Sequence, residues 1–286
     1  MRLALSRRQS FLVQVLTMVF CTGLLWAGDI SPADVLQKHL DSIGLAAARG
    51  QIKSRVIQGA VTYRILVGGS GAIDGKFQFA SEGQKSDYLF RVNAGGYLGE
   101  QFICDGNKTS VAGTYSDKTR SEFGNFVLAQ DMILRENLLG GVWSSAWPLL
   151  DLGDRKARLH AEGMKKVDGK EFIVLRYEPK KLTDLNIFLY FDPQTYRHVM
   201  TLYKMDPSTS VSGGETAQSG KMTRRYRIEE RFSDFQTANG LTLPQRYDLR
   251  YTLESESGFT KSVEWEVKAL NIANNMSIDA RAFQVK

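Results

Sequence analysis

The side chains able to carry out chemistry are few and are scattered along the chain. His39 falls in an expected helix, whereas His160 and His198 fall in expected strands, and no two of them have the spacing of metal ligands. The sequence contains no HExxH, CxxC or GxSxG motif. We therefore expect surface or rim histidines, no metal site and no cofactor.

The remaining candidates for catalysis also have a structural interpretation. Cys104 lies on the apolar face of an expected strand, where a thiol is usually buried and inert. Glu229 and Glu230 are neighbours in another expected strand, so their side chains point to opposite faces and form no catalytic pair. The glycine-rich stretch 68–71 lacks the helix that a phosphate-binding loop requires and is interpreted as a turn. We expect a protein that is not an enzyme, with an exported hydrolase as the weakest alternative.

Residues 1–28 have the features of an export signal. Three arginines precede an apolar run over residues 11–26, and small residues follow at Ala27 and Gly28. We expect cleavage near that point, leaving residues 29–286 as one domain in the periplasm. An uncleaved membrane anchor is the alternative, because the run is near the lower limit of about 17–25 residues for a spanning helix. A twin-arginine signal and a lipidated Cys21 fit less well.

The charge of the mature chain is nearly balanced. The full sequence of 286 residues has 37 basic and 31 acidic residues, with a pI near 9.2. Without the three leader arginines, 34 basic residues remain against the 31 acidic ones, a net charge of +3. A nucleic-acid-binding surface needs a concentrated basic patch, so we expect no nucleic-acid partner. Cys104 has no disulfide partner once Cys21 leaves with the signal, so the core alone must stabilise the fold.

The longest apolar passage of the mature chain is the insert, residues 126–150. Its first part carries apolar residues at roughly helical spacing, which predicts one amphipathic helix that ends at Gly140-Gly141. Trp143 and Trp147 belong to a second short apolar piece that Pro148 interrupts. We expect a movable lid with hinges at the two glycines and at Pro148, and the alternative is a permanent plug.

The rest of the mature chain alternates apolar and polar residues with the period of β-strands. Short strands joined by glycine-rich turns predict an antiparallel meander over residues 56–104. Further strands are expected over residues 159–204 and 226–272, with hairpin turns at Asp168-Gly169 and Asn239-Gly240. An apolar insert among such strands needs a concave place in which to be buried.

Three other stretches complete the expected architecture. Ser31-Pro32 predicts the start of a helix that Gly50 ends. Strands within residues 172–177 and 187–191 are apolar on both faces, so we expect both faces to be covered. Residues 206–221 are rich in Ser, Thr and Gly and are expected to form a loop.

Several short motifs, taken in order, resemble those of the LolA/LolB-type lipoprotein-carrier superfamily. Besides the export signal, the N-terminal helix and the mid-chain apolar helices, they are Cys104-Asp105-Gly106, Tyr190-Phe191-Asp192-Pro193-Gln194-Thr195, Phe232-Ser233-Asp234-Phe235, Asn239-Gly240-Leu241-Thr242-Leu243-Pro244, and Leu270-Asn271-Ile272 with Phe283. The resemblance covers most of residues 31–286. It implies a mainly β fold, in which a single antiparallel sheet curls into an unclosed half-barrel with the helices packed in its concave side.

The resemblance also implies a function. Members of this superfamily bind lipid acyl chains in an apolar cavity and carry lipids or lipoproteins across the periplasm, so we expect a carrier in outer-membrane lipoprotein sorting or lipid transport. The candidate residues for the cavity and its lid are Phe77, Phe79, Phe90, Phe102, Met132, Leu134, Leu138, Leu139, Trp143, Trp147 and Trp265. We expect acyl chains as the ligand, inner- or outer-membrane proteins as possible partners, and a monomer. The alternative is an envelope sensor that detects lipoproteins and acts through a protein partner.

Overall fold

The computed structural model describes residues 30–94, 97–114, 119–205 and 224–285. The expected export signal (1–28) and the expected loop (206–221) lie outside the described residues. Within them, no helix is long and apolar enough to cross a membrane.

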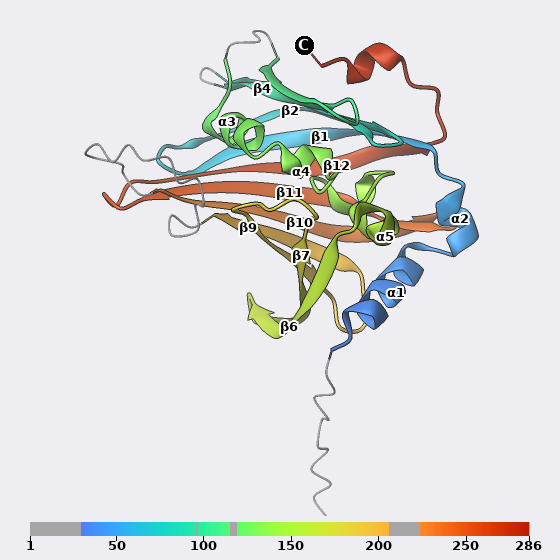
Figure 1. Cartoon of the computed structure of the whole chain (residues 1–286). Helices are drawn as coiled ribbons and strands as arrows, with labels where there is room; N and C mark the ends of the chain where they lie inside the picture. The colour runs from blue at the N-terminus through green and yellow to red at the C-terminus, as the bar shows by residue number, and fades with distance from the viewer. Residues whose placement is uncertain (1–29, 95–96, 115–118, 206–223, 286) are drawn as a thin grey trace, which may run out of the picture.

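The described strands form one antiparallel sheet in the order β5-β4-β3-β2-β1-β12-β11-β10-β9-β8-β7-β6. The strands are β1 Ser54–Val67, β2 Gly71–Glu82, β3 Lys85–Ala94, β4 Tyr97–Cys104, β5 Thr109–Gly113, β6 Arg158–Val167, β7 Lys170–Glu178, β8 Asn186–Phe191, β9 His198–Met205, β10 Arg224–Ala238, β11 Leu241–Ser255 and β12 Thr260–Asn274. The end strands β5 and β6 do not pair with each other, so the sheet stays open, and it curves around the insert (Figure 1). The predicted mainly β half-barrel is confirmed.

The turn residues explain the hairpins. Asp168 and Gly169 join β6 to β7 with φ angles of 49° and 81°, and Asn239 and Gly240 join β10 to β11 with φ angles of 53° and 76°. Two consecutive residues in the left-handed region match the right-handed twist of the paired strands. Both hairpins predicted from the sequence are therefore confirmed.

The N-terminal helix is shorter than predicted. Helix α1 spans Pro32–Ile43, and the Ser31 hydroxyl caps it by accepting a hydrogen bond from the Asp34 amide at 3.3 Å. Gly44 ends it at φ 150°, and a separate short helix, α2, spans Ala46–Gly50. The prediction of one helix up to Gly50 is wrong because Gly44 has a non-helical backbone conformation where the chain passes the β10–β11 hairpin. Only glycine fits there, since a Cβ would lie 2.3 Å from the Gly240 carbonyl oxygen.

The predicted single helix in the insert is also broken. The segment forms helices α3 (Glu122–Ala129) and α4 (Met132–Arg135), the 3-10 turns η1 (Gly141–Trp143) and η2 (Pro148–Leu150), and helix α5 (Leu152–Arg155). Met132, Ile133 and Leu134 are all buried. These three residues point to different sides of α4, so the core encloses α4, and the break at residues 130–131 separates it from helix α3.

Apolar side chains of the insert and of the concave face of the sheet form one large core cluster. On the other face, Val174, Tyr190, Met200 and Leu202 form a second cluster, which confirms that these strands are apolar on both sides. At this end of the sheet Asp168, in the turn between β6 and β7, forms an ion pair at 2.7 Å with Arg231 of β10, so the β6–β7 hairpin reaches back across the intervening strands.

Phe283 and Cys104 are two further buried residues. Phe283, in the 3-10 turn η4 (Ala280–Phe283), is 2% exposed and anchors the C-terminal segment. Cys104 at the end of β4 is buried without a disulfide, and burial raises the pKa of its thiol. A raised thiol pKa lowers the thiolate fraction, which agrees with the expectation of an inert cysteine.

Candidate functional site

The candidate residues predicted from the sequence all belong to the large core cluster, and each is 7% exposed or less. Four of them come from β2, β3 and β4 on one half of the sheet, Trp265 comes from β12, and the others come from the insert. The structure therefore brings the predicted site residues together. That they line a ligand cavity stays a prediction.

The aromatic members of this set contact each other directly. The ring centroids of Phe77 and Trp143 are 5.7 Å apart, those of Phe77 and Phe90 are 5.1 Å apart, and those of Phe90 and Trp265 are 6.0 Å apart. These separations are typical of packed aromatic pairs. The insert thus completes the core in the structure and covers the residues of the sheet that the sequence singled out.

The middle of the insert, residues 138–147, is fixed to the sheet by buried hydrogen bonds, and we call it the anchored turn. Arg55 of β1 donates to the carbonyl oxygens of Val142 (2.7 Å) and Trp143 (3.0 Å). The Trp143 indole donates to the Pro244 carbonyl oxygen at 2.9 Å, and the Tyr88 hydroxyl donates to that of Leu139. Since Arg55 is only 4% exposed, its guanidinium depends on these carbonyl oxygens in place of water.

A buried carboxylate holds the other end of the 3-10 turn η1. Glu230 of β10 accepts hydrogen bonds from the Gly140 amide (2.6 Å), the Tyr203 hydroxyl (2.6 Å) and the Tyr247 hydroxyl (2.8 Å). Burial raises the pKa of Glu230 to about 7, although these three donors act to lower it. Glu229, its neighbour, pairs on the opposite face with Arg227, which confirms that the two side chains point to opposite faces of the sheet.

Two of the three histidines contradict the prediction of a surface or rim position. His39 of α1 and His198 of β9 are each 1% exposed, whereas the side chain of His160 is 38% exposed and pairs with Glu178. The Trp147 indole donates to Nε2 of His39 at 3.4 Å and lies 5.1 Å from the His198 ring. Burial lowers the pKa of His39 to about 4 and that of His198 well below its usual value, so both remain neutral beneath the insert.

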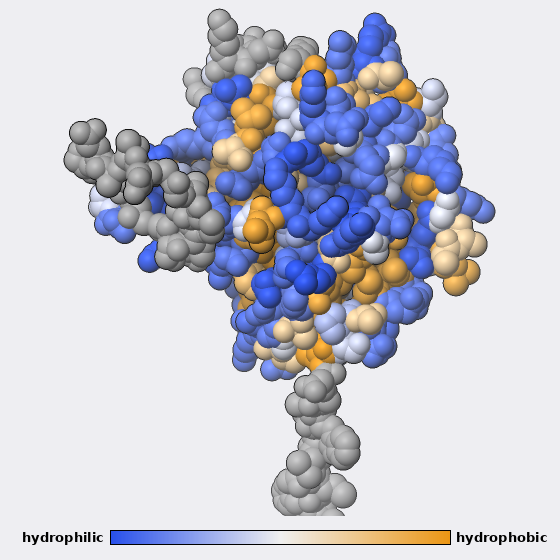
Figure 2. Space-filling view, in the orientation of Figure 1, coloured by the Kyte–Doolittle hydropathy of each residue, from blue (hydrophilic) through white to orange (hydrophobic). Residues whose placement is uncertain are grey.

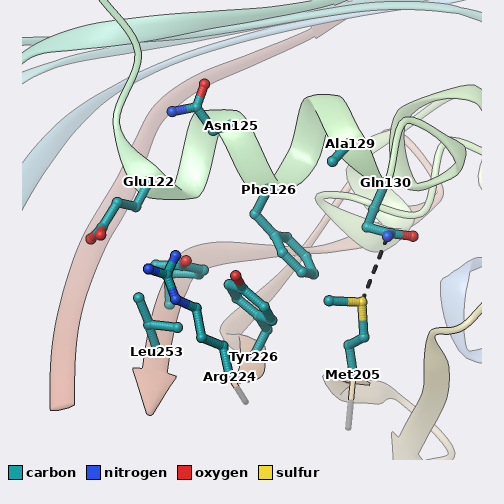
Figure 3. A pocket seen from close by; sticks show the side chains of 10 residues that line it. Glu122, Asn125, Phe126, Ala129, Gln130, Met205, Arg224, Tyr226 and Leu253 are labelled. Carbon is teal, nitrogen blue, oxygen red and sulfur yellow. Dashed lines mark hydrogen bonds between the residues drawn. The ribbon is translucent and has the colours of Figure 1, made fainter. Parts of the chain in front are cut away.

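Helix α3 covers a half-open cavity of about 260 Å³, which we call the rim pocket (Figure 3). The residues that line it are Glu122, Asn125, Phe126, Ala129, Gln130, Met205, Arg224, Tyr226, Tyr251 and Leu253. Phe126 of α3 points toward Tyr226 of β10 in Figure 3, with ring centroids 4.9 Å apart. At the end of α3 the Gln130 amide reaches the Met205 sulfur at 3.6 Å. The rim pocket therefore has apolar walls and polar groups at its edge.

A second open cavity, of about 330 Å³, continues from the rim pocket. The two share Ala129 and Gln130, and the second extends along Met132 to the loop at residues 181–184. Leu182 in that loop is 95% exposed. On the face shown in Figure 2, outside the grey atoms, apolar areas are small and separated by hydrophilic residues. The two adjoining cavities are therefore a better candidate for the site of ligand entry than any apolar area on this face of the surface.

Sequence reasoning missed the polar residues of the site. Arg55 has the same strand parity as Ile57, and Glu230 has the same parity as Ile228 and Phe232, all of which are buried on the concave face. A charged residue on an apolar strand face is a signal that could have identified both. The rim pocket had no comparable signal, because it forms between α3 and strand ends that are distant in sequence.

No protein-family model matches the chain, and no curated protein is similar to it at a significant level. Among solved structures, the chain is similar to a LolA superfamily protein from Nitrosomonas europaea, with 13% identity, 90% of this chain and 98% of that chain covered, and a TM-score of 0.46. It is also similar to a DUF1329 family protein from Desulfovibrio piger, with 10% identity, 88% of this chain and 96% of that chain covered, and a TM-score of 0.48. A chain of the Pseudomonas aeruginosa MucA/MucB complex is 12% identical, with 85% of this chain and 100% of that chain covered and a TM-score of 0.25. The first bears the family name that the sequence resemblance indicated. With every TM-score below 0.5, none assigns a ligand, partner or activity to this chain.

Proposed function

We propose that this protein is an exported carrier that binds the apolar chain of a lipid or lipoprotein in the concave side of its half-barrel. The rim pocket carries the proposal, because it is an open, aromatic-walled cavity at the edge of the large apolar core. The adjoining cavity along Met132 gives it the elongated form that a hydrocarbon chain requires. With the expected export signal, we propose that the carrier acts in the periplasm, where lipids and lipoproteins must cross water.

The moving element in this proposal is α3 rather than the whole insert. Its apolar side consists of Phe123, Phe126 and Val127, which are 1%, 6% and 0% exposed. Its polar ties lie at its ends, where Glu122 pairs with Lys261 at 2.9 Å and Gln130 contacts Met205. The anchored turn, in contrast, is bonded to the sheet through its middle, so α3 can leave while Trp143 and Trp147 stay in place.

The free energy lost when α3 leaves the core and the free energy gained when a hydrocarbon chain replaces it are of similar size. Fully burying a side chain such as Val or Phe contributes about 1.5–3 kcal/mol, so releasing the apolar side of α3 costs roughly 5–9 kcal/mol. A hydrocarbon chain with roughly ten buried methylenes contributes about 8 kcal/mol at about 0.8 kcal/mol each. A chain of this length can therefore replace α3 over the core, and α3 can displace the chain again on release.

Native mass spectrometry combined with lipid extraction tests the proposal. The full chain, purified from a cell that exports it, is expected to carry a sub-stoichiometric lipid that organic solvent removes. Decanol added to the delipidated protein should restore a one-to-one complex. Absence of both the co-purified lipid and the decanol complex would overturn the carrier function. A stable protein complex without lipid would instead favour the envelope sensor.

A further inference from the structure

The rim pocket contains a buried hydroxyl group that has no partner. Tyr251 of β11 is 1% exposed, and its hydroxyl makes no hydrogen bond within the described part of the chain. A buried polar group without a partner is costly, and native proteins seldom keep one without a use for it. Because Tyr251 lines the rim pocket, a ligand that enters can supply the missing bond.

A cation lies at the same pocket. Arg224 of β10 also lines it, and its guanidinium has no ion pair or hydrogen bond to any residue that the structure describes. Burial raises the pKa of Tyr251, Tyr226 and Glu122 raise it further, and Arg224 lowers it, so the hydroxyl lies within electrostatic reach of this guanidinium. The two groups thus offer a donor and a positive charge to one ligand.

The acidic residue of the pocket has a cation of its own. Glu122 pairs with Lys261 at 2.9 Å, so Arg224, Lys261 and Glu122 together leave one net positive charge at the pocket. Figure 3 shows Glu122 and Arg224 at the same side of the pocket, with Phe126 and Met205 farther along it. The charged residues therefore lie at one end of the pocket and the apolar residues at the other, which matches the polar head and apolar chain of an amphiphile.

We propose that the rim pocket is a headgroup site that binds the anionic oxygens of an amphiphile, a carboxylate or a phosphate, on Arg224 and the Tyr251 hydroxyl. The inference rests on the proposed carrier function, because the chain attached to this head occupies the apolar walls and the space that α3 covers. A guanidinium and a hydroxyl both donate to oxyanions, and the positive charge of the guanidinium repels a cationic head. The ligand class is thus an anionic lipid or fatty acid rather than a neutral or cationic one.

Isothermal titration calorimetry with decanoate, decyl phosphate, decanol and inorganic phosphate tests the inference at constant ionic strength. The two anionic amphiphiles are expected to bind about tenfold more tightly than decanol, since charge-assisted hydrogen bonds are about twice as strong as neutral ones. Inorganic phosphate alone should bind far more weakly than decyl phosphate. Equal affinity for inorganic phosphate and decyl phosphate would overturn the inference, because the hydrocarbon chain would then contribute nothing to binding.

Two substitutions and a matched control locate the headgroup. Arg224→Gln should weaken decanoate binding about tenfold and leave decanol unchanged, and Tyr251→Phe should weaken it about three- to tenfold without lowering the thermal midpoint. Arg225→Gln removes the same charge from the adjacent residue, which does not line the pocket, and should change neither affinity. If decanol binds but decanoate is not preferred, or if Arg225→Gln has the effect of Arg224→Gln, the headgroup site is disproved and the carrier function stands. If no amphiphile binds, both fail.

Discussion

The two parts of the insert region are attached to the same core in different ways. The anchored turn has its middle bonded to the sheet by Arg55 and Glu230. Helix α3 has its polar ties at its ends and covers an open pocket. Both parts bury large aromatic side chains, so apolar burial alone does not distinguish a fixed element from one that can leave.

The difference lies in what remains behind when each part moves. Displacing the anchored turn would leave the carboxylate of Glu230 and the guanidinium of Arg55 buried without their backbone partners, which is far more costly than exposing hydrocarbon. Displacing α3 while Ser121, at its N-terminal end, stays bonded to the buried carboxylate of Glu100 exposes mainly apolar surface, which a hydrocarbon chain can cover. The choice between a lid and a plug is therefore made separately for each segment, and the following substitutions test it.

The largest effect is expected at Trp143, in the anchored turn. Trp143→Ala removes a fully buried ring and its hydrogen bond to the Pro244 carbonyl oxygen, and it should lower the free energy of unfolding by about 3–5 kcal/mol. Urea denaturation followed by circular dichroism measures this loss. Leu150→Ala, at a residue 38% exposed, is the control and should cost under about 1 kcal/mol. A loss of that small size for Trp143→Ala would show that the anchored turn detaches readily.

The second effect is a pH dependence that Glu230 creates. Its pKa is about 7 in the folded protein and 4.5 in its ordinary state, so the folded form binds the proton more tightly. The stabilisation from this proton is complete below about pH 4.5 and is lost as the pH rises through about 7. Glu230→Gln mimics the protonated state, so its stability relative to the native protein should rise by about 3 kcal/mol between pH 4.5 and 8.

Urea titrations of both proteins across that range provide the measurement. His39, whose pKa is lowered to about 4, makes the stability of each protein rise with pH between about 4 and 6.5. This contribution cancels in the difference between the two proteins, because both contain His39. A difference that stays constant with pH would show that Glu230 titrates normally and does not hold the anchored turn as a buried carboxylate.

A smaller effect is expected at the N-terminal cap of α3. The Ser121 hydroxyl accepts from the Gly124 amide at 3.0 Å and donates to Glu100 at 2.7 Å. Ser121→Ala should lower the global stability by about 1 kcal/mol and speed amide hydrogen exchange across α3 but not across the anchored turn. Exchange that increases equally in both segments would show that they open as one lid, as the sequence alone suggested.

The smallest effect is expected from the ion pair at the edge of α3. Lys261→Gln removes the partner of Glu122, and both side chains are partly exposed, so the loss of stability should stay below about 1 kcal/mol. Stopped-flow mixing with decanol should nevertheless show faster association, because α3 opens more often. Unchanged association kinetics would indicate that α3 does not limit ligand entry.

Local sequence chemistry predicted much of the fold. The Asp168-Gly169 and Asn239-Gly240 hairpins and the two-sided apolar strands followed from residues that are adjacent in sequence. The burial of the aromatic candidates on the strands could also be predicted from the sequence, because strand parity places them on one face of the sheet. The helix break after α3 could not be predicted from the sequence, since it depends on the shape of the surface on which the chain lies.

The sequence by itself determined the strands, the turns and the apolar face, because backbone preference and side-chain parity depend only on near neighbours. Only the tertiary structure decided that Glu230 and Arg55 bind the insert and that His198 is buried beneath it, because these contacts depend on what packs across from a residue. It also decided that Tyr251 and Arg224 meet under α3. The proposed headgroup site is made from strand ends and a helix that are distant in sequence, so the tertiary structure alone brings its residues together.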